Sequence, residues 1–141
     1  MNPMHRDLET AAASRRVKTE AVRPEEGVGS MARAFPEVER VLQAAGVAFL
    51  ELNYDARAGH GEFTTVRCIG PDGKSMSWLL PAALRQEVCS SLEGVIRRRY
   101  PKWTTLEGSC GRFVWDLSRD VLEHRHSARY IEYETWFFYG L

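Results

Sequence analysis

Apolar positions from residue 35 onward follow first a helical and then a strand spacing. Pro36 opens a segment in which apolar residues recur every three or four positions as far as Ala45, and Gly46 follows as a natural helix stop. Residues 47–54 then alternate, which is typical of a half-buried strand. The side chains expected to face the core are Ala48, Leu50, Leu52 and Tyr54. The pattern therefore predicts a helix over 36–45 and a strand over 47–54.

The same two spacings return further along the chain. Residues 62–69 predict a second strand, the Gly-Pro-Asp-Gly run at 70–73 predicts a turn, and residues 74–79 predict a third strand or a short edge. An apolar stripe behind Pro81 predicts a second helix that ends near Tyr100-Pro101. Further strands are expected over 103–107, 110–117, 120–126 and 129–139, with a tight turn at 118–120.

The predicted element order is α-β-β-(β)-α-β-β-β. Hairpin turns join the strands, and single helices separate the runs of strands, which favours an antiparallel sheet over a parallel one. We expect an α+β domain over residues 35–141, with a sheet of about five to six strands and two helices packed on one face. We interpret residues 1–34 as a mobile N-terminal extension, because they hold few large apolar residues. Asp7 is placed to cap a short helix over 8–22, and Met31 is an alternative start of the natural chain.

Composition narrows the function classes. The 141 residues suit one domain, with 44% hydrophobic and 27% charged residues. Lys plus Arg and Asp plus Glu both number 19, so no global field steers the chain to nucleic acid or to an anionic membrane. No apolar run is long enough to span a bilayer, and no signal peptide is visible. The three cysteines form no C-x-x-C pair, so we expect a reduced, cytoplasmic protein without a metal or cofactor.

The closing strand run, residues 121–141, concentrates ionisable and aromatic side chains. On a strand, its aromatic residues divide between both faces, and one set must cover the outer sheet face or meet a partner. This is the best indication of function in the sequence, and it favours binding over catalysis. The predicted partner-binding residues are Glu123, His124, His126, Arg129, Tyr130, Tyr133, Glu134 and Trp136. The alternative is a terminal strand that is buried on both sides.

Three other features carry weaker chemical hypotheses. His124 and His126 share a face of a strand, where Glu132 or Glu134 would complete a metal site, although such residues also protect an exposed strand. His60 lies in a glycine turn, as a flexible acid or base or simply as an exposed turn residue. Cys110 is a nucleophile only if a base lowers its pKa, and otherwise it is a small buried residue. No complete catalytic set is legible, so an enzyme is the least favoured reading.

A basic and aromatic cluster ends the second predicted helix. Such interleaving is typical of nucleic-acid binding, whereas cations at a helix C-terminus are also favoured by the helix dipole. The residues of this alternative site are Arg97, Arg98, Arg99, Lys102 and Trp103. A nucleic-acid-associated factor is therefore the second hypothesis, behind a small accessory module that binds a protein partner or forms a homodimer.

Several short segments resemble a small, uncharacterised bacterial domain family of unknown function, common in proteobacterial genomes and mobile elements. The segments are Leu42-Gln43-Ala44-Ala45-Gly46, Asn53-Tyr54-Asp55, Gly59-His60-Gly61-Glu62, Tyr100-Pro101-Lys102-Trp103, Glu107-Gly108-Ser109-Cys110-Gly111, Phe113-Val114-Trp115-Asp116, Leu122-Glu123-His124, Arg129-Tyr130 and Tyr133-Glu134-Thr135. The resemblance covers about residues 36–137 and implies a shared fold without an established activity. The chain departs from the family pattern at His60, where the family's glycine-rich turn carries an acidic residue.

Overall fold

The computed structural model describes residues 7–19, 23–24, 29–105 and 107–139, and it describes side chains over 29–105 and 107–130. Its elements in chain order are β1 (Asp7–Thr19), β2 (Arg23–Pro24), α1 (Met31–Ala34), α2 (Pro36–Ala44), β3 (Phe49–Arg57), β4 (His60–Ile69), α3 (Ala82–Arg99), β5 (Ser109–Asp116) and β6 (Val121–Tyr139). One antiparallel sheet runs in the order β1-β6-β5-β3-β4, and β2 also pairs with β6.

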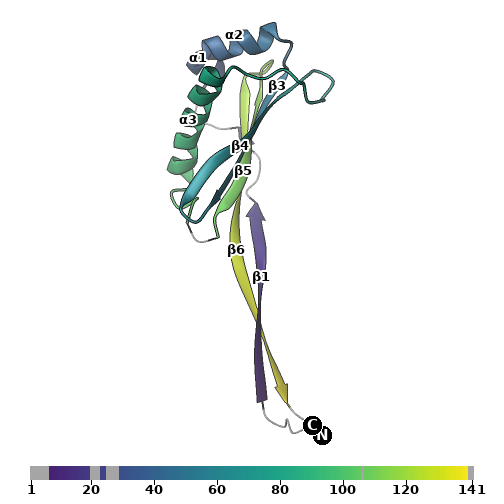
Figure 1. Cartoon of the computed structure of the whole chain (residues 1–141), viewed down its shortest axis with the longest axis vertical. Helices are drawn as coiled ribbons and strands as arrows, with labels where there is room; N and C mark the ends of the chain where they lie inside the picture. The colour runs from purple at the N-terminus through teal and green to yellow at the C-terminus, as the bar shows by residue number, and fades with distance from the viewer. Residues whose placement is uncertain (1–6, 20–22, 25–28, 106, 140–141) are drawn as a thin grey trace.

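The sheet divides into a body and an arm (Figure 1). In the body, four strands lie side by side in the order β6-β5-β3-β4, α3 runs along one face, and α2 lies at one end. The last pair between β5 and β6 joins Ser109 to Ala128, whereas the pairing of β1 with β6 runs from Thr19 and Ser127 out to Asp7 and Tyr139. The arm is therefore the β1–β6 ribbon that continues beyond the end of β5.

The core lies between the helices and the inner face of the body sheet. Leu50 pairs with Trp115, which pairs with Leu122, so one row of buried side chains crosses three strands. The helices bury apolar side chains against these rows. The fully buried helical residues are Met31, Val38, Leu42, Val88, Leu92 and Ile96. The predicted alternation that sends Leu50, Leu52 and Tyr54 to the core is confirmed.

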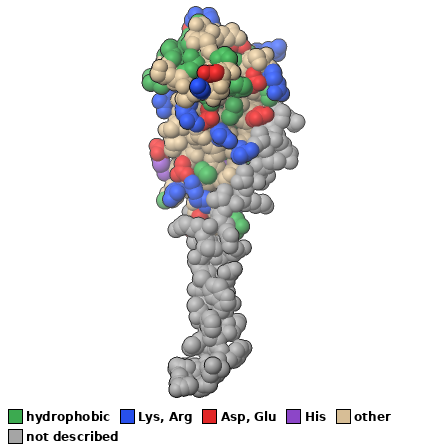
Figure 2. Space-filling model, turned by 90° about the vertical axis from the view of Figure 1, so that its right-hand side faces the viewer, with side chains coloured by type: hydrophobic (Ala, Val, Ile, Leu, Met, Phe, Trp, Pro, Cys, Tyr) green, Lys and Arg blue, Asp and Glu red, His purple; other side chains and the backbone are tan. Residues whose placement is uncertain are grey.

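The outer face of the body sheet is polar. Because alternate residues of a strand point to opposite faces, the neighbours of the core residues form rows on the other side. One row joins Thr65, Asn53, Arg112 and Arg125 across the four strands, and the adjacent row joins Arg67, Glu51, Val114 and Glu123. Figure 2 shows basic and acidic side chains interspersed over the surface of the body.

The α+β class and the antiparallel sheet are confirmed, but several predicted elements were wrong. Residues 103–105 and 107 lie in turns and bends rather than in a strand, and residue 106 lies outside the described residues. Trp103 N donates to Tyr100 O, and Gly108 N donates to Thr105 O. Residues 74–79 form no strand, since only Ser75 bridges Ile69. The two strands predicted over 120–126 and 129–139 are one strand, β6.

The N-terminal prediction also needs correction. The helix expected over 8–22 is wrong, because residues 7–19 form a strand whose partner, β6, is more than a hundred residues away in the chain. Helix α1 was not predicted, and its Met31 is fully buried, so the core begins before the expected domain start at residue 35. The mobility predicted for residues 1–34 stays a prediction, and residues 1–6, 20–22 and 25–28 lie outside the described residues.

Asp120 holds α1 against the turn between β5 and β6. Its carboxylate accepts hydrogen bonds from Ser30 Oγ (2.5 Å), Ala32 N (3.1 Å) and Trp115 Nε1 (3.0 Å). Burial alone would raise the pKa of Asp120, but these bonds outweigh burial and lower it. The carboxylate therefore joins a turn, a helix start and a core indole.

We expect Asp120→Ala to lower the free energy of unfolding by about 2 kcal/mol or more, because bonds to a charged acceptor are lost and the Trp115 N–H loses its acceptor. Asp120→Asn keeps an acceptor oxygen and tolerates the positive φ of 49°. It should therefore cost less in urea unfolding at pH 7. The pKa of Asp120 is lower in the folded than in the unfolded protein. The contribution of its charge to the free energy of unfolding is therefore present above the unfolded pKa and is lost as pH falls through the folded pKa. Equal losses in both variants would contradict this role.

Candidate functional site

Seven of the eight predicted partner-binding residues occupy three different environments along β6. Glu123 is exposed on the outer face, and Tyr130 is 43% exposed. His124 and His126 are buried, with 3% and 4% exposure, so neither side chain lies on an exposed surface of the body. Tyr133, Glu134 and Trp136 pair through the backbone with Ala13, Ala12 and Thr10 of β1, and their side chains lie outside the described residues.

Arg129 is the eighth predicted binding residue, and it is tied to the body. It forms an ion pair with Asp55, and its Nη1 donates to the carbonyl oxygens of Ala56 (3.2 Å) and Ser109 (3.1 Å). Its backbone N also donates to Gly108 O (2.9 Å). The side chain therefore fixes β6 to β3 and β5 at the point where the arm leaves the body.

The two buried histidines converge on one phenol. Tyr54 Oη on β3 lies 2.7 Å from His124 Nε2 and 2.7 Å from His126 Nδ1. A phenol has one proton, so it donates to one imidazole and accepts the N–H of the other. The imidazole that accepts the phenol proton must be neutral, whereas the other needs only an N–H to donate. We refer to Tyr54, His124 and His126 as the Tyr–His network.

Aromatic rings enclose the network. Tyr100 stacks on His126 with ring centroids 3.8 Å apart, and Phe113 stacks on His124 at 4.1 Å. Trp103 meets Tyr54 edge-on at 5.7 Å. The packing ties the C-terminal end of α3 to the first half of β6.

The register leaves space for Tyr54 through a glycine. Gly111 on β5 pairs with both Tyr54 and His126, and a Cβ at this position would overlap the Tyr54 hydroxyl and lie 2.5 Å from Arg125 O. The backbone cannot give way easily, because it belongs to the sheet ladder. Gly111 is therefore needed for the phenol to reach both imidazoles.

Burial lowers the pKa of His126 to about 4, with further contributions from His124 and Arg99. The groups that face His126 are Tyr54 on β3, His124 on the same strand, and Arg99 and Tyr100 at the end of α3. The imidazole stays neutral at pH 7. Because solutes cannot reach either buried ring, the network supports packing and register rather than general acid–base catalysis.

Acid should destabilise the protein through His126. The folded pKa lies below the unfolded value of 6.5, so stability is full above 6.5 and falls as pH drops toward 4. The loss over this window is on the order of 3 kcal/mol. His126→Phe keeps the ring and should flatten the dependence in urea unfolding between pH 7 and pH 4.5, whereas the exposed His60→Gln should leave it unchanged. A His126→Phe slope equal to that of the parent would contradict the assignment.

Gly111→Ala should lower the free energy of unfolding by about 3 kcal/mol, because overpacking against Tyr54 and the β6 backbone cannot relax cheaply. Gly94→Ala is the matched control on α3. Its Cβ would meet only Arg98 Nη1 at 3.4 Å, and alanine is the better helix former, so stability should rise by about 1 kcal/mol. Equal effects of the two substitutions in thermal or urea unfolding would show that Gly111 is not constrained.

Some residues of the basic cluster at the end of α3 already contact other side chains of the protein. Arg97 forms an ion pair with Glu93 at 3.0 Å, and the Arg99 guanidinium lies 5.6 Å from the Tyr100 ring centroid. Arg98 and Lys102 are exposed. Trp103, the aromatic residue of the alternative nucleic-acid site, is only 5% exposed and packs over Gly61, so its ring does not lie on an exposed surface. Burial removes the aromatic half of the proposed nucleic-acid site.

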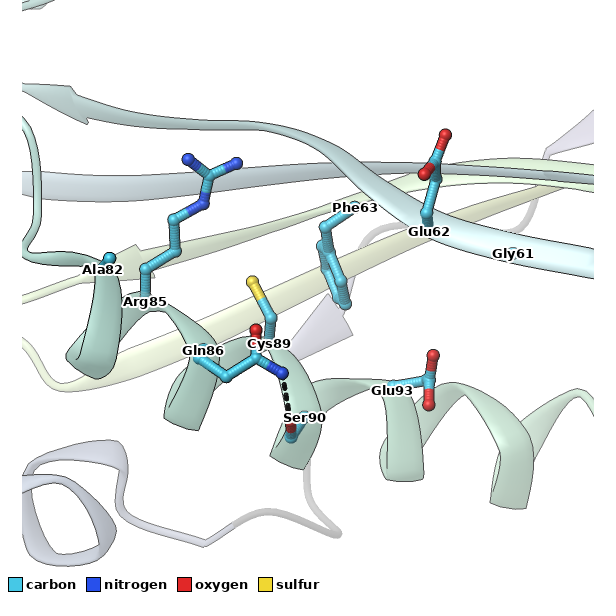
Figure 3. A pocket seen from close by; sticks show the side chains of 9 residues that line it. All are labelled: Gly61, Glu62, Phe63, Ala82, Arg85, Gln86, Cys89, Ser90 and Glu93. Carbon is cyan, nitrogen blue, oxygen red and sulfur yellow. Dashed lines mark hydrogen bonds between the residues drawn. The ribbon is translucent and has the colours of Figure 1, made fainter.

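A groove separates α3 from strand β4. Two adjoining hollows of about 500 and 510 Å³ share Gly61 and Glu93. Figure 3 shows Phe63 reaching from β4 toward α3 beside Cys89, with Arg85 and Glu93 along the helix. The charges alternate in sign along the groove, so they indicate no single class of ligand. His60 lines the second hollow and is exposed, as the first residue of β4 directly after the turn at Gly59, which has a φ of 83°.

The remaining chemical hypotheses find little support in the described residues. Among them, no group of three or more His, Cys, Asp or Glu side chains is placed to hold a metal ion. Glu132 and Glu134, which were expected to complete a site with the two histidines, have side chains outside that part of the chain. Cys110 is a free, half-buried thiol on the outer face, opposite Ser127. None of the helices among the described residues is long and apolar enough to cross a membrane.

Comparison of the chain with protein-family models, with curated proteins and with solved structures found no match. The resemblance to a bacterial family over residues 36–137 therefore stays a prediction.

Proposed function

We propose that this chain is an interaction module that associates with a second copy of itself through the β1–β6 arm. The observation that carries the proposal is the length of β6, which has 19 residues, whereas β5 has 8. Beyond Ala128 the only strand paired with β6 in the described part of the chain is β1. At about 3.3 Å per residue, residues 129–139 extend the ribbon by about 36 Å.

A two-stranded ribbon is marginally stable in water on its own. Each of its two edges carries backbone N–H and C=O groups that a further strand would satisfy. The β6 portion of the arm is also rich in residues that dominate protein interfaces. The aromatic residues at positions 129–139 are Tyr130, Tyr133, Trp136, Phe137, Phe138 and Tyr139. These features favour an arm whose strand edges and aromatic side chains are covered by another protein.

A second copy is the partner that fits these features most simply. Two antiparallel ribbons related by a two-fold axis are self-complementary, because the same edge serves both subunits. A formal net charge of zero adds no overall repulsion between copies. Binding, rather than catalysis, in a cytoplasmic setting is part of the same proposal. The nucleic-acid alternative through α3 is not pursued, because Trp103 is buried.

The test is the molar mass of the full chain by size-exclusion chromatography with light scattering. We expect a dimer for the parent. Trp136→Lys combined with Phe138→Lys, two positions of one strand face, should give a monomer. The matched control is Leu79→Lys on a loop of the body, where the parent side chain is 72% exposed, and it should stay dimeric.

A parent that remains monomeric at the highest concentration it tolerates would overturn self-association. A double variant that remains dimeric would exclude the arm as the interface. Circular dichroism of each variant checks that the body still folds, so a loss of dimer is not mistaken for a loss of structure.

A further inference from the structure

Two arginines lie directly opposite each other on the outer face of the sheet. Arg112 on β5 pairs with Arg125 on β6, in the row that continues to Asn53 on β3 and Thr65 on β4. Like charges at opposite positions of an antiparallel pair are unfavourable. The sequence therefore retains a costly arrangement in the middle of a sheet, where a neutral residue would serve the fold better.

Other arginines on this face have carboxylate partners. Arg67 pairs with Glu51 at 2.5 Å, Arg129 pairs with Asp55, and Arg57 lies 3.6 Å from the same Asp55. Among the described residues, neither Arg112 nor Arg125 forms an ion pair or a side-chain hydrogen bond.

Glu51 is the carboxylate whose charge Arg112 influences, and it is already engaged. Burial would raise the pKa of Glu51, but hydrogen bonds from Arg67 and Asn53 and the charges of Arg67 and Arg112 together lower it. The oxygen Oε1 accepts from both Asn53 Nδ2 (2.9 Å) and Arg67. Glu51 is therefore the partner of Arg67, and the N–H donors of the Arg112 and Arg125 guanidinium groups remain available for a ligand.

The two arginines border a shallow hollow that contains no carboxylate. Its volume is about 260 Å³, and its lining residues are Asn53, Tyr54, Cys110, Gly111, Arg112, Arg125 and Ser127. A second hollow of about 180 Å³ lies on the other side of the pair and includes Glu123. An anion is accommodated better in the first hollow, away from the Glu123 charge.

We propose that Arg112 and Arg125 bind a phosphate group in this hollow. Each guanidinium offers a planar fork of N–H donors that matches phosphate oxygens. Two opposing forks need an anion with several acceptor oxygens and a charge that offsets both cations, which a phosphate supplies better than a single carboxylate. The source is either a small phosphate ester or the phosphodiester backbone of a nucleic acid, and both share this chemistry. The site is independent of the arm.

Binding is measured on the full chain by isothermal titration calorimetry, with inorganic phosphate, a nucleoside monophosphate and a single-stranded oligonucleotide as probes. Arg112→Gln combined with Arg125→Gln should weaken binding by about tenfold or more, because charge-assisted hydrogen bonds are lost. Glu123→Gln should strengthen it, since a nearby negative charge is removed. The control is Arg98→Gln on α3, which removes one exposed charge elsewhere and should change little.

The probes separate the two sources. Comparable affinity for the monophosphate and the oligonucleotide identifies a small phosphate ester, whereas a much higher, steeply salt-dependent affinity for the oligonucleotide identifies a nucleic-acid backbone. Both outcomes support the site if they depend on Arg112 and Arg125. Absence of binding to all three probes, or equal loss in Arg98→Gln, would overturn it.

Stability provides a second readout. If the pair is kept for binding rather than folding, Arg112→Gln alone should leave the urea midpoint unchanged or raise it, because the repulsion from Arg125 is relieved. A lower midpoint that is restored by Arg112→Lys would show that the cation has a structural role and would contradict the proposal.

Discussion

The hydroxyl of Tyr54 is the point on which the register of three strands depends. It lies within hydrogen-bond distance of two buried imidazoles, and the loss of a buried hydrogen bond of this kind costs about 1–3 kcal/mol. A slip of β6 by one residue would turn Arg125 inward and the histidines outward. The alternative registers are therefore penalised by a buried guanidinium as well as by lost hydrogen bonds. A polar network of this kind adds specificity to a core whose energy is mainly apolar.

The rings around the network explain two features that lie far apart in the sequence. Tyr100 ends α3 in contact with His126, and Trp103 follows in a turn that lays its ring over Gly61 of β4. The segment after residue 102, which was predicted to be a strand, is therefore a turn that places the Trp103 ring against the sheet, where the Tyr100 ring also packs. Gly111 and Gly61 are required because a ring lies where a Cβ would project.

The sequence predicts the buried face of a strand well where large apolar and polar residues alternate, and poorly where every position of the strand is polar. The alternation in β3 identified its buried face correctly, from Leu50 to Tyr54. In β6 the run Glu123-His124-Arg125-His126 is polar at every position, so nothing in it distinguishes the inward histidines from the outward charged residues. The signal lies in the partner strand, since Phe113 and Gly111 pair with His124 and His126.

Long-range pairing accounts for the other failures. Residues 7–19 are rich in alanine and charged residues, which favours a helix locally, and their strand form depends on a partner at the other end of the chain. The opposition of Arg112 and Arg125 likewise exists only through the register of β5 and β6. Neither property can be read from spacing along the chain, because each is created when distant segments pair.

One continuous strand links the two proposals to the core. The first half of β6 presents His124 and His126 to the helices, and the residue between them, Arg125, to the outer face. The second half leaves the body after Arg129, whose bonds to β3 and β5 set its point of departure. Side chains alternate between the two faces of a strand. Because the Tyr–His network fixes which β6 residues point inward, it also fixes that Arg125 points to the outer face and in which direction the arm leaves the body. The buried network thus sets the orientation of the residues on which both proposals rest.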